Sequence, residues 1–136
     1  GISVLSLSES DDHLSLVQLR ALVVVTDAGT LTSSKLAGRL GVSPSTATRV
    51  CDHLIAAGLL HRTTNPSDRR AVLLEASRSG IALVNRIMEH RRHNFARILK
   101  AVDPDDRQRI GEALGLLTAR ISELYGEHAL IEWPIS

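Results

Sequence analysis

Aromatic side chains are scarce in this chain, which has one Phe, one Trp and one Tyr among 136 residues. The core must therefore be filled by Leu, Ile, Val and Ala, and this favours helices packed on helices.

Cysteine is equally scarce: Cys51 has no second cysteine with which to form an internal disulfide, which indicates a reducing compartment. No apolar run approaches the roughly 18 residues that span a bilayer, and no signal-peptide pattern is present. We therefore expect a cytoplasmic protein without membrane association.

Motifs for catalysis and metal binding are also missing from the sequence. It contains no Gly-rich phosphate loop, no nucleophile elbow and no HExxH. His90 and His93 have a spacing compatible with a metal pair, but no Cys, Asp or Glu cluster completes a site. Cys51 is expected on the inner side of a helix, which favours core packing over a redox sensor. We expect no enzymatic activity, no cofactor and no metal.

Charge is distributed unevenly along the chain, although the net charge is only +1. Residues 1–32 carry one basic and four acidic residues, a net charge of −3. Residues 33–78 carry seven basic and three acidic residues, a net charge of +4, and residues 79–136 carry eight of each. A basic excess in the middle of the chain suits a polyanionic partner such as double-stranded DNA.

The middle of the chain has the pattern of two helices joined by a tight turn. Thr32 is expected to cap a short first helix, and Gly41 tolerates the positive φ of the turn. Ser43 and Pro44 have the residue types preferred at the N-cap and first position of a second helix, which runs to about Ala57. The pattern predicts a helix-turn-helix.

The exposed side of that second helix carries small hydroxyl side chains and a basic group. Small side chains allow a helix to enter the major groove, and Arg49 can donate two hydrogen bonds to guanine. The candidate DNA-binding residues of this helix are Ser43, Ser45, Thr46, Thr48, Arg49 and His53.

Two apolar-alternating segments flank a polar turn after the second helix, and they predict a β-hairpin. Its tip carries Asp68, Arg69 and Arg70, so the hairpin is expected to act as a wing. An arginine at such a tip can enter the minor groove. We expect Asp68 to orient the guanidinium of Arg70 on one side of the strand, and Arg69 to point to the other side.

Three further helices are expected around these elements. The first covers residues 14–28 and ends at Gly29. The second begins at Ser77 or Ser79 and runs to Val102. The third begins at Pro104, with Asp103 as its expected N-cap. The last two carry narrow apolar stripes and are expected to form an antiparallel pair that is buried against a second copy of the chain.

The chain resembles the MarR (multiple antibiotic resistance regulator) family from Leu16 to Leu124. The segments that carry the resemblance are Leu19–Leu22, Leu36–Arg49, Leu54–Leu60 and Asp68–Leu74, of which the Asp-x-Arg wing is the most specific. The resemblance implies a mainly α fold with a small β-hairpin wing: a winged helix-turn-helix with long dimerisation helices. It also implies one domain over 1–136, with the DNA-binding lobe at 14–78 and the dimerisation region at 1–13 and 79–136.

The resemblance further implies a homodimer that binds an inverted repeat near a promoter and is released by a small aromatic effector. Arg20 and His90 are the candidate effector-binding residues. In that family a full helix precedes the segment matching Leu14, where this sequence has only residues 1–8. Two alternatives remain open: a repressor without an effector, and a winged-helix module that binds a partner protein. The arginines at positions 49, 69 and 70 argue against the protein-binding module.

Overall fold

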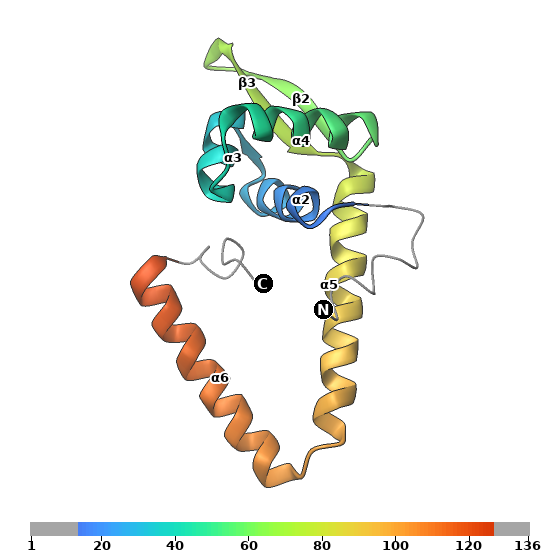
Figure 1. Ribbon diagram of the computed structural model, residues 1–136, viewed down its shortest axis with the longest axis vertical. Helices are drawn as coiled ribbons and strands as arrows, with labels where there is room; N and C mark the ends of the chain where they lie inside the picture. The colour runs from blue at the N-terminus through green and yellow to red at the C-terminus, as the bar shows by residue number, and fades with distance from the viewer. Residues whose placement is uncertain (1–13, 127–136) are drawn as a thin grey trace. The chain divides into compact units, whose positions relative to one another are not determined.

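The computed structural model describes residues 14–126, and within this range the chain is mainly helical with one small antiparallel sheet (Figure 1). This confirms the predicted winged helix-turn-helix class. The elements are α2 (Leu16–Ala28), β1 (Thr30–Leu31), α3 (Ser33–Leu40), α4 (Pro44–Ala56), β2 (Leu60–Asn65), β3 (Asp68–Ala76), α5 (Arg78–Lys100) and α6 (Pro104–Tyr125).

The chain divides into two compact units, residues 1–87 and residues 88–136. The first unit contains α2 through β3 and the first turns of α5, and the second contains the rest of α5 and α6. The first turns of α5 therefore pack with the helix-turn-helix lobe, where Gly80, Leu83 and Val84 are buried. The predicted contribution of residues 1–13 to dimerisation lies outside the described residues.

Local capping explains where the two helices of the helix-turn-helix begin. Thr32 accepts a hydrogen bond from the backbone of the first turn of α3, and Ser43 does the same for α4, directly before Pro44. Between the two helices, Gly41 adopts φ 67°, a left-handed conformation that glycine accepts without steric cost. These are the positions at which the sequence predicts caps and a turn.

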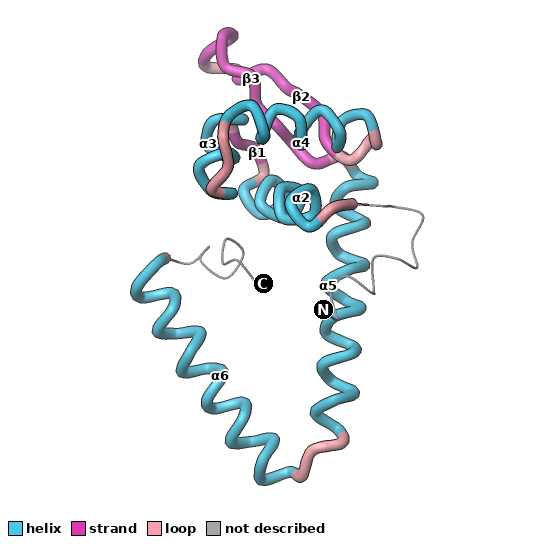
Figure 2. Tube along the Cα trace, in the orientation of Figure 1, coloured by secondary structure: helices cyan, strands magenta, loops and turns pink. Residues whose placement is uncertain are grey.

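The sheet has the strand order β1-β3-β2, with all neighbours antiparallel (Figure 2). Strand β1 was not predicted from the sequence, because two residues are too short to show any periodicity. The hairpin register is regular as far as the pair Thr64 and Val72 and then shifts, so that Asn65 faces Asp68. Residues 69–71 consequently form a bulge at the tip with no partner on β2.

The core of the first unit is aliphatic, as the scarcity of aromatic residues predicts. No aromatic side chain is among the buried residues of the described chain. The largest side chains that are fully buried are Leu22, Leu36, Leu54, Leu83, Val24, Val25 and Cys51.

Ser77 joins the end of α4, the sheet and the start of α5. Its hydroxyl donates to the carbonyl oxygen of Gly58 at 2.6 Å and accepts from the backbone N–H of Gly80 at 3.0 Å. Its own backbone N–H donates to the carbonyl oxygen of Leu59 at 2.9 Å. Ser77 is therefore the N-cap of α5, the first of the two residues suggested by the sequence, and Gly80 is held against Leu59.

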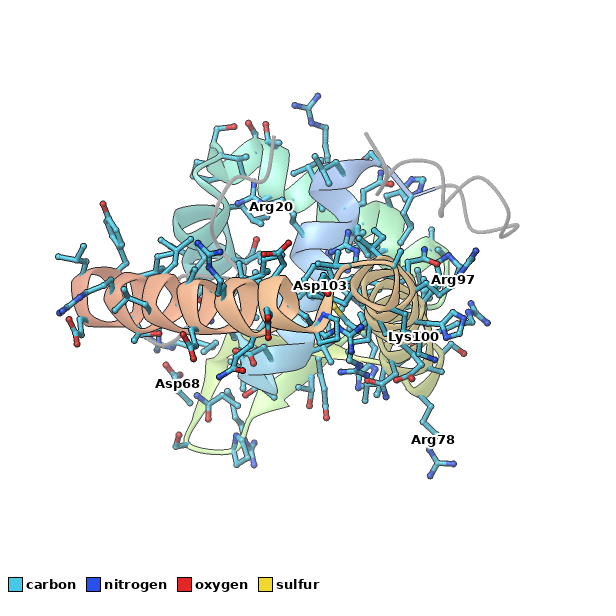
Figure 3. All side chains as sticks on the ribbon, turned by 90° about the horizontal axis from the view of Figure 1, so that it is seen from below. Arg20, Asp68, Arg78, Arg97, Lys100 and Asp103 are labelled. Carbon is cyan, nitrogen blue, oxygen red and sulfur yellow. The ribbon has the colours of Figure 1, made fainter. Side chains whose placement is uncertain are left out.

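In the second unit, Arg107 secures the turn between α5 and α6. Its guanidinium donates to the carbonyl oxygens of Leu99 at 2.9 Å and Val102 at 3.2 Å, which satisfies acceptors at the end of α5. Arg97 and Lys100 in the last turn of α5 complement the negative end of the helix dipole (Figure 3). Asp103 precedes α6 as expected, but its side chain makes no capping hydrogen bond.

Large apolar side chains of the second unit are exposed in the single chain. Helix α6 has no buried residue, so the expected antiparallel packing of α5 and α6 does not bury its apolar stripe. The exposed apolar residues of this unit are Phe95, Ile98, Ile110, Leu114, Leu116, Leu117, Leu124 and Tyr125. None of the helices between residues 14 and 126 is both long enough and apolar enough to cross a membrane.

Candidate nucleic-acid interface

Helix α4 has one buried face and one polar face, as its sequence predicts. The buried face consists of Ala47, Val50, Cys51 and Leu54 and holds the helix on the lobe. Of the predicted DNA-binding residues on this helix and its cap, five are exposed and Thr46 is half-buried. The exposed residues are Ser43, Ser45, Thr48, Arg49 and His53.

Hydrogen bonds within the first turns of α4 link several of these side chains. The Ser43 hydroxyl lies 2.9 Å from the Thr46 hydroxyl and 3.1 Å from the Ser45 hydroxyl. Arg49 donates from its guanidinium to the Thr46 hydroxyl at 3.3 Å, which restrains an exposed arginine before any ligand binds. The Thr48 hydroxyl donates to the carbonyl oxygen of Pro44 at 3.0 Å.

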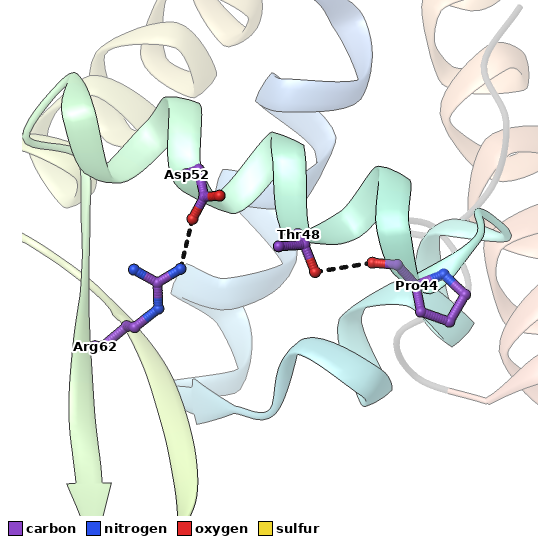
Figure 4. A network of polar contacts seen from close by, with 4 residues as sticks. All are labelled: Pro44, Thr48, Asp52 and Arg62. Carbon is purple, nitrogen blue, oxygen red and sulfur yellow. Dashed lines mark hydrogen bonds and ion pairs between the residues drawn. The ribbon is translucent and has the colours of Figure 1, made fainter.

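An ion pair connects the polar face of α4 to the wing (Figure 4). The guanidinium of Arg62, on β2, donates to Asp52 Oδ1 at 2.6 Å. Neither residue is among the candidate site residues predicted from the sequence. Because the two residues are ten positions apart and belong to different elements, only the tertiary structure brings them together.

At the wing tip Asp68 contacts Arg70 as predicted, but it contacts the backbone of Arg70 and not the side chain. Asp68 Oδ1 accepts a hydrogen bond from the backbone N–H of Arg70 at 3.0 Å, whereas the prediction was a bond from the guanidinium. Because residues 69–71 form the bulge, simple strand alternation does not fix which sides Arg69 and Arg70 face. Asp68 lies on the hairpin (Figure 3), and all three predicted tip residues are exposed.

Cys51 is buried on the inner face of α4, in agreement with the core-packing interpretation. Burial raises the pKa of its thiol, and this effect outweighs the opposing effect of the nearby Arg62 guanidinium. A buried thiol with a raised pKa is mostly protonated and therefore a poor nucleophile at neutral pH.

The two predicted effector-binding residues belong to different units. Arg20 is half-buried on α2 in the first unit, and His90 is exposed on α5 in the second. A site formed by both residues stays a prediction. Within residues 14–126, no group of three or more His, Cys, Asp or Glu side chains has the arrangement of a metal site.

The sequence of this chain is similar to those of known proteins. Residues 14–72 match the model of the MarR family. A curated relative, the uncharacterised HTH-type transcriptional regulator Mb0904 of Mycobacterium bovis, is 34% identical over 110 residues, which cover 81% of this chain and 77% of the relative.

Solved structures agree with this similarity. The crystal structure of RV1404 from Mycobacterium tuberculosis superposes with a TM-score of 0.79 and 34% identity, covering 87% of this chain and 81% of that one. Streptococcus pneumoniae FabT, solved in complex with DNA, has a TM-score of 0.73 and 21% identity, covering 90% of this chain and 87% of that one. At that identity the FabT comparison supports the fold alone.

Proposed function

Since the chain belongs to the MarR family of helix-turn-helix transcriptional regulators, we propose that it binds an inverted-repeat operator as a homodimer and represses transcription. Proteins of this family are regulators of transcription and not enzymes. The observation that carries the proposal is the exposed polar face of α4, which belongs to the same lobe as the arginine-bearing wing. In this proposal α4 enters the major groove and Arg70 of the wing enters the minor groove.

Salt dependence distinguishes this function from the alternative of a module that binds a partner protein. Contacts to several phosphates make the logarithm of the DNA-binding constant fall linearly and steeply with the logarithm of the salt concentration. A shallow dependence, with no preference among duplexes, would favour the protein-binding module. The proposed effector remains a small aromatic acid or phenol that loosens DNA binding, with Arg20 and His90 as its candidate contacts.

Replacing Arg49 with alanine should relax the preference for one base pair in each half-site. Arg49 is exposed on α4 and already restrained by Thr46, which suits bidentate binding to guanine. We expect a loss of roughly 1–3 kcal/mol on the preferred operator and a smaller loss on duplexes changed at that base pair. Equilibrium binding to a set of single-base-pair operator variants measures this difference.

Arg92→Ala is the matched control for Arg49→Ala, because it removes an exposed arginine in the second unit that is paired with Glu89. Its base preferences should equal those of the parent. If Arg49→Ala weakens binding to all duplexes by the same factor, Arg49 contacts a phosphate and the assignment to a base is wrong.

Dimerisation should bury the exposed apolar stripe of α6. Leu117 lies on this stripe with 56% of its surface exposed, and a glutamate there would place an unpaired charge in the interface. We expect the parent to sediment as a dimer at micromolar concentration and Leu117→Glu to sediment as a monomer that binds the operator weakly. The control Gln108→Glu, which places a negative charge on another face of α6, should remain a dimer. A monomeric parent would contradict the proposal.

A further inference from the structure

Asp52 occupies an unexpected position for an acidic residue in a DNA-binding helix. It follows Ser45 by seven residues and Thr48 by four, so the three side chains share the exposed face of α4. The side chain of Asp52 is 57% exposed. A carboxylate alone on this face would repel phosphates, and its presence there requires a physical reason.

Arg62 neutralises Asp52 and fixes its orientation. The guanidinium of Arg62 contacts Asp52 Oδ1 at 2.6 Å from strand β2, and its side chain is 48% exposed. A pair this exposed contributes little to the stability of the fold. The other carboxylate oxygen, Oδ2, accepts no hydrogen bond from any residue in the described part of the chain. One oxygen is therefore anchored, while the other remains available on the polar face of α4.

We propose that Asp52, positioned by Arg62, accepts a hydrogen bond from the exocyclic amino group of a base in the major groove, above all cytosine N4. This inference rests on the proposed DNA-binding function. An ionised carboxylate accepts hydrogen bonds and cannot donate them. In the major groove cytosine and adenine present amino donors, whereas guanine and thymine present only acceptors, which a carboxylate disfavours. The pair enters the groove as a neutral unit because Arg62 cancels the charge of Asp52.

The test selects binding sequences from a library of randomised double-stranded DNA and sequences the bound fraction. The parent should show one position in each half-site at which cytosine or adenine is preferred because of Asp52. In Asp52→Ala that preference should fall by about 5-fold to about 150-fold. Binding to non-operator DNA should become tighter and its log–log salt slope steeper by about one, because Arg62 is then free to bind a phosphate. The salt slope reports the added phosphate contact of Arg62, whereas the selected sequences report the loss of base recognition.

Two further variants separate the roles of the two residues. Asp52→Asn retains the size of the side chain but adds donor hydrogens, so it should relax the discrimination against guanine and thymine at the same position. Arg62→Ala leaves Asp52 unpaired. Its uncompensated charge should weaken binding to every duplex, and the loss of its fixed orientation should reduce the preference for cytosine or adenine at that position. Thermal unfolding of each variant should be close to that of the parent, because the pair is exposed.

Glu89→Ala is the matched control, since it removes the carboxylate of another exposed ion pair, with Arg92 at 2.8 Å, in the second unit. It should leave the selected sequence unchanged. If Asp52→Ala and Asp52→Asn both select the same sequence as the parent, with the same strength at every position, the inference is overturned and the pair is only a structural link. A parent that enriches no sequence would instead overturn the proposed function, and this inference with it.

Discussion

Replacing Gly80 with alanine should lower the free energy of unfolding by about 3 kcal/mol, at the upper end of the usual cost of overpacking. A Cβ atom at this position would overlap the backbone carbonyl oxygen of Leu59 and lie 3.1 Å from Leu22 Cδ1. The carbonyl belongs to the turn that Ser77 fixes by two hydrogen bonds, so it cannot move without breaking them. Thermal and urea unfolding followed by far-ultraviolet circular dichroism measure the loss.

Gly38→Ala is the matched control for this effect. Gly38 lies within α3, and a Cβ atom there would meet no other atom within 4 Å. Alanine has a higher helix propensity than glycine, so this variant should be about as stable as the parent or more stable by up to about 1 kcal/mol. If Gly80→Ala also proves neutral or stabilising, the close contact between α5 and Leu59 does not constrain the fold as described.

Arg70→Ala should weaken operator binding by about 2–3 kcal/mol, the size expected when hydrogen bonds from a charged group are lost. Asp68→Ala should weaken it by about 1 kcal/mol, although it removes a negative charge from the surface that faces DNA. The reason is that Asp68 Oδ1 holds the backbone N–H of Arg70, and without this bond the bulged tip has more conformations to lose on binding. Binding titrations at one fixed salt concentration measure both effects.

Asp68→Asn separates the bracing role from the charge. The amide oxygen of asparagine can still accept the backbone N–H of Arg70, so this variant should bind at least as well as the parent. Simple charge counting predicts that both Asp68 variants bind more tightly. Tighter binding by Asp68→Ala would therefore show that the brace is unimportant and that Asp68 only lowers the positive potential of the tip.

The parts of the fold set by local interactions could be predicted from the sequence. Gly41 marks the turn, and Ser43 and Pro44 mark the start of α4. The start of α5 was narrowed to Ser77 or Ser79, of which the structure has Ser77. Each of these signals depends on hydrogen bonds or backbone angles within a few residues, which the sequence displays directly. The polar face of α4 was predictable for the same reason, because helical periodicity assigns residues to faces.

The parts that depend on contacts between distant segments could not be predicted. Strand β1 exists only because Thr30 and Leu31 pair with β3. The link between Asp52 and Arg62 depends on how α4 sits against β2, and the sequence alone does not fix that arrangement. At the wing tip, the side-chain alternation of a regular strand predicted a contact between Asp68 and the guanidinium of Arg70. In the bulged tip Asp68 accepts from the backbone N–H of Arg70 instead.

The aliphatic core described above has a consequence for how far such a sequence can diverge. Rings impose specific shapes and orientations on their neighbours, whereas Leu, Ile, Val and Ala fill space in many interchangeable combinations of similar total volume. A lobe whose buried side chains contain no ring can therefore exchange core residues in compensating steps and keep the same backbone. Substitutions among interior aliphatic residues are then tolerated. Substitutions are poorly tolerated at the few positions fixed by backbone geometry, such as Gly41 and Gly80.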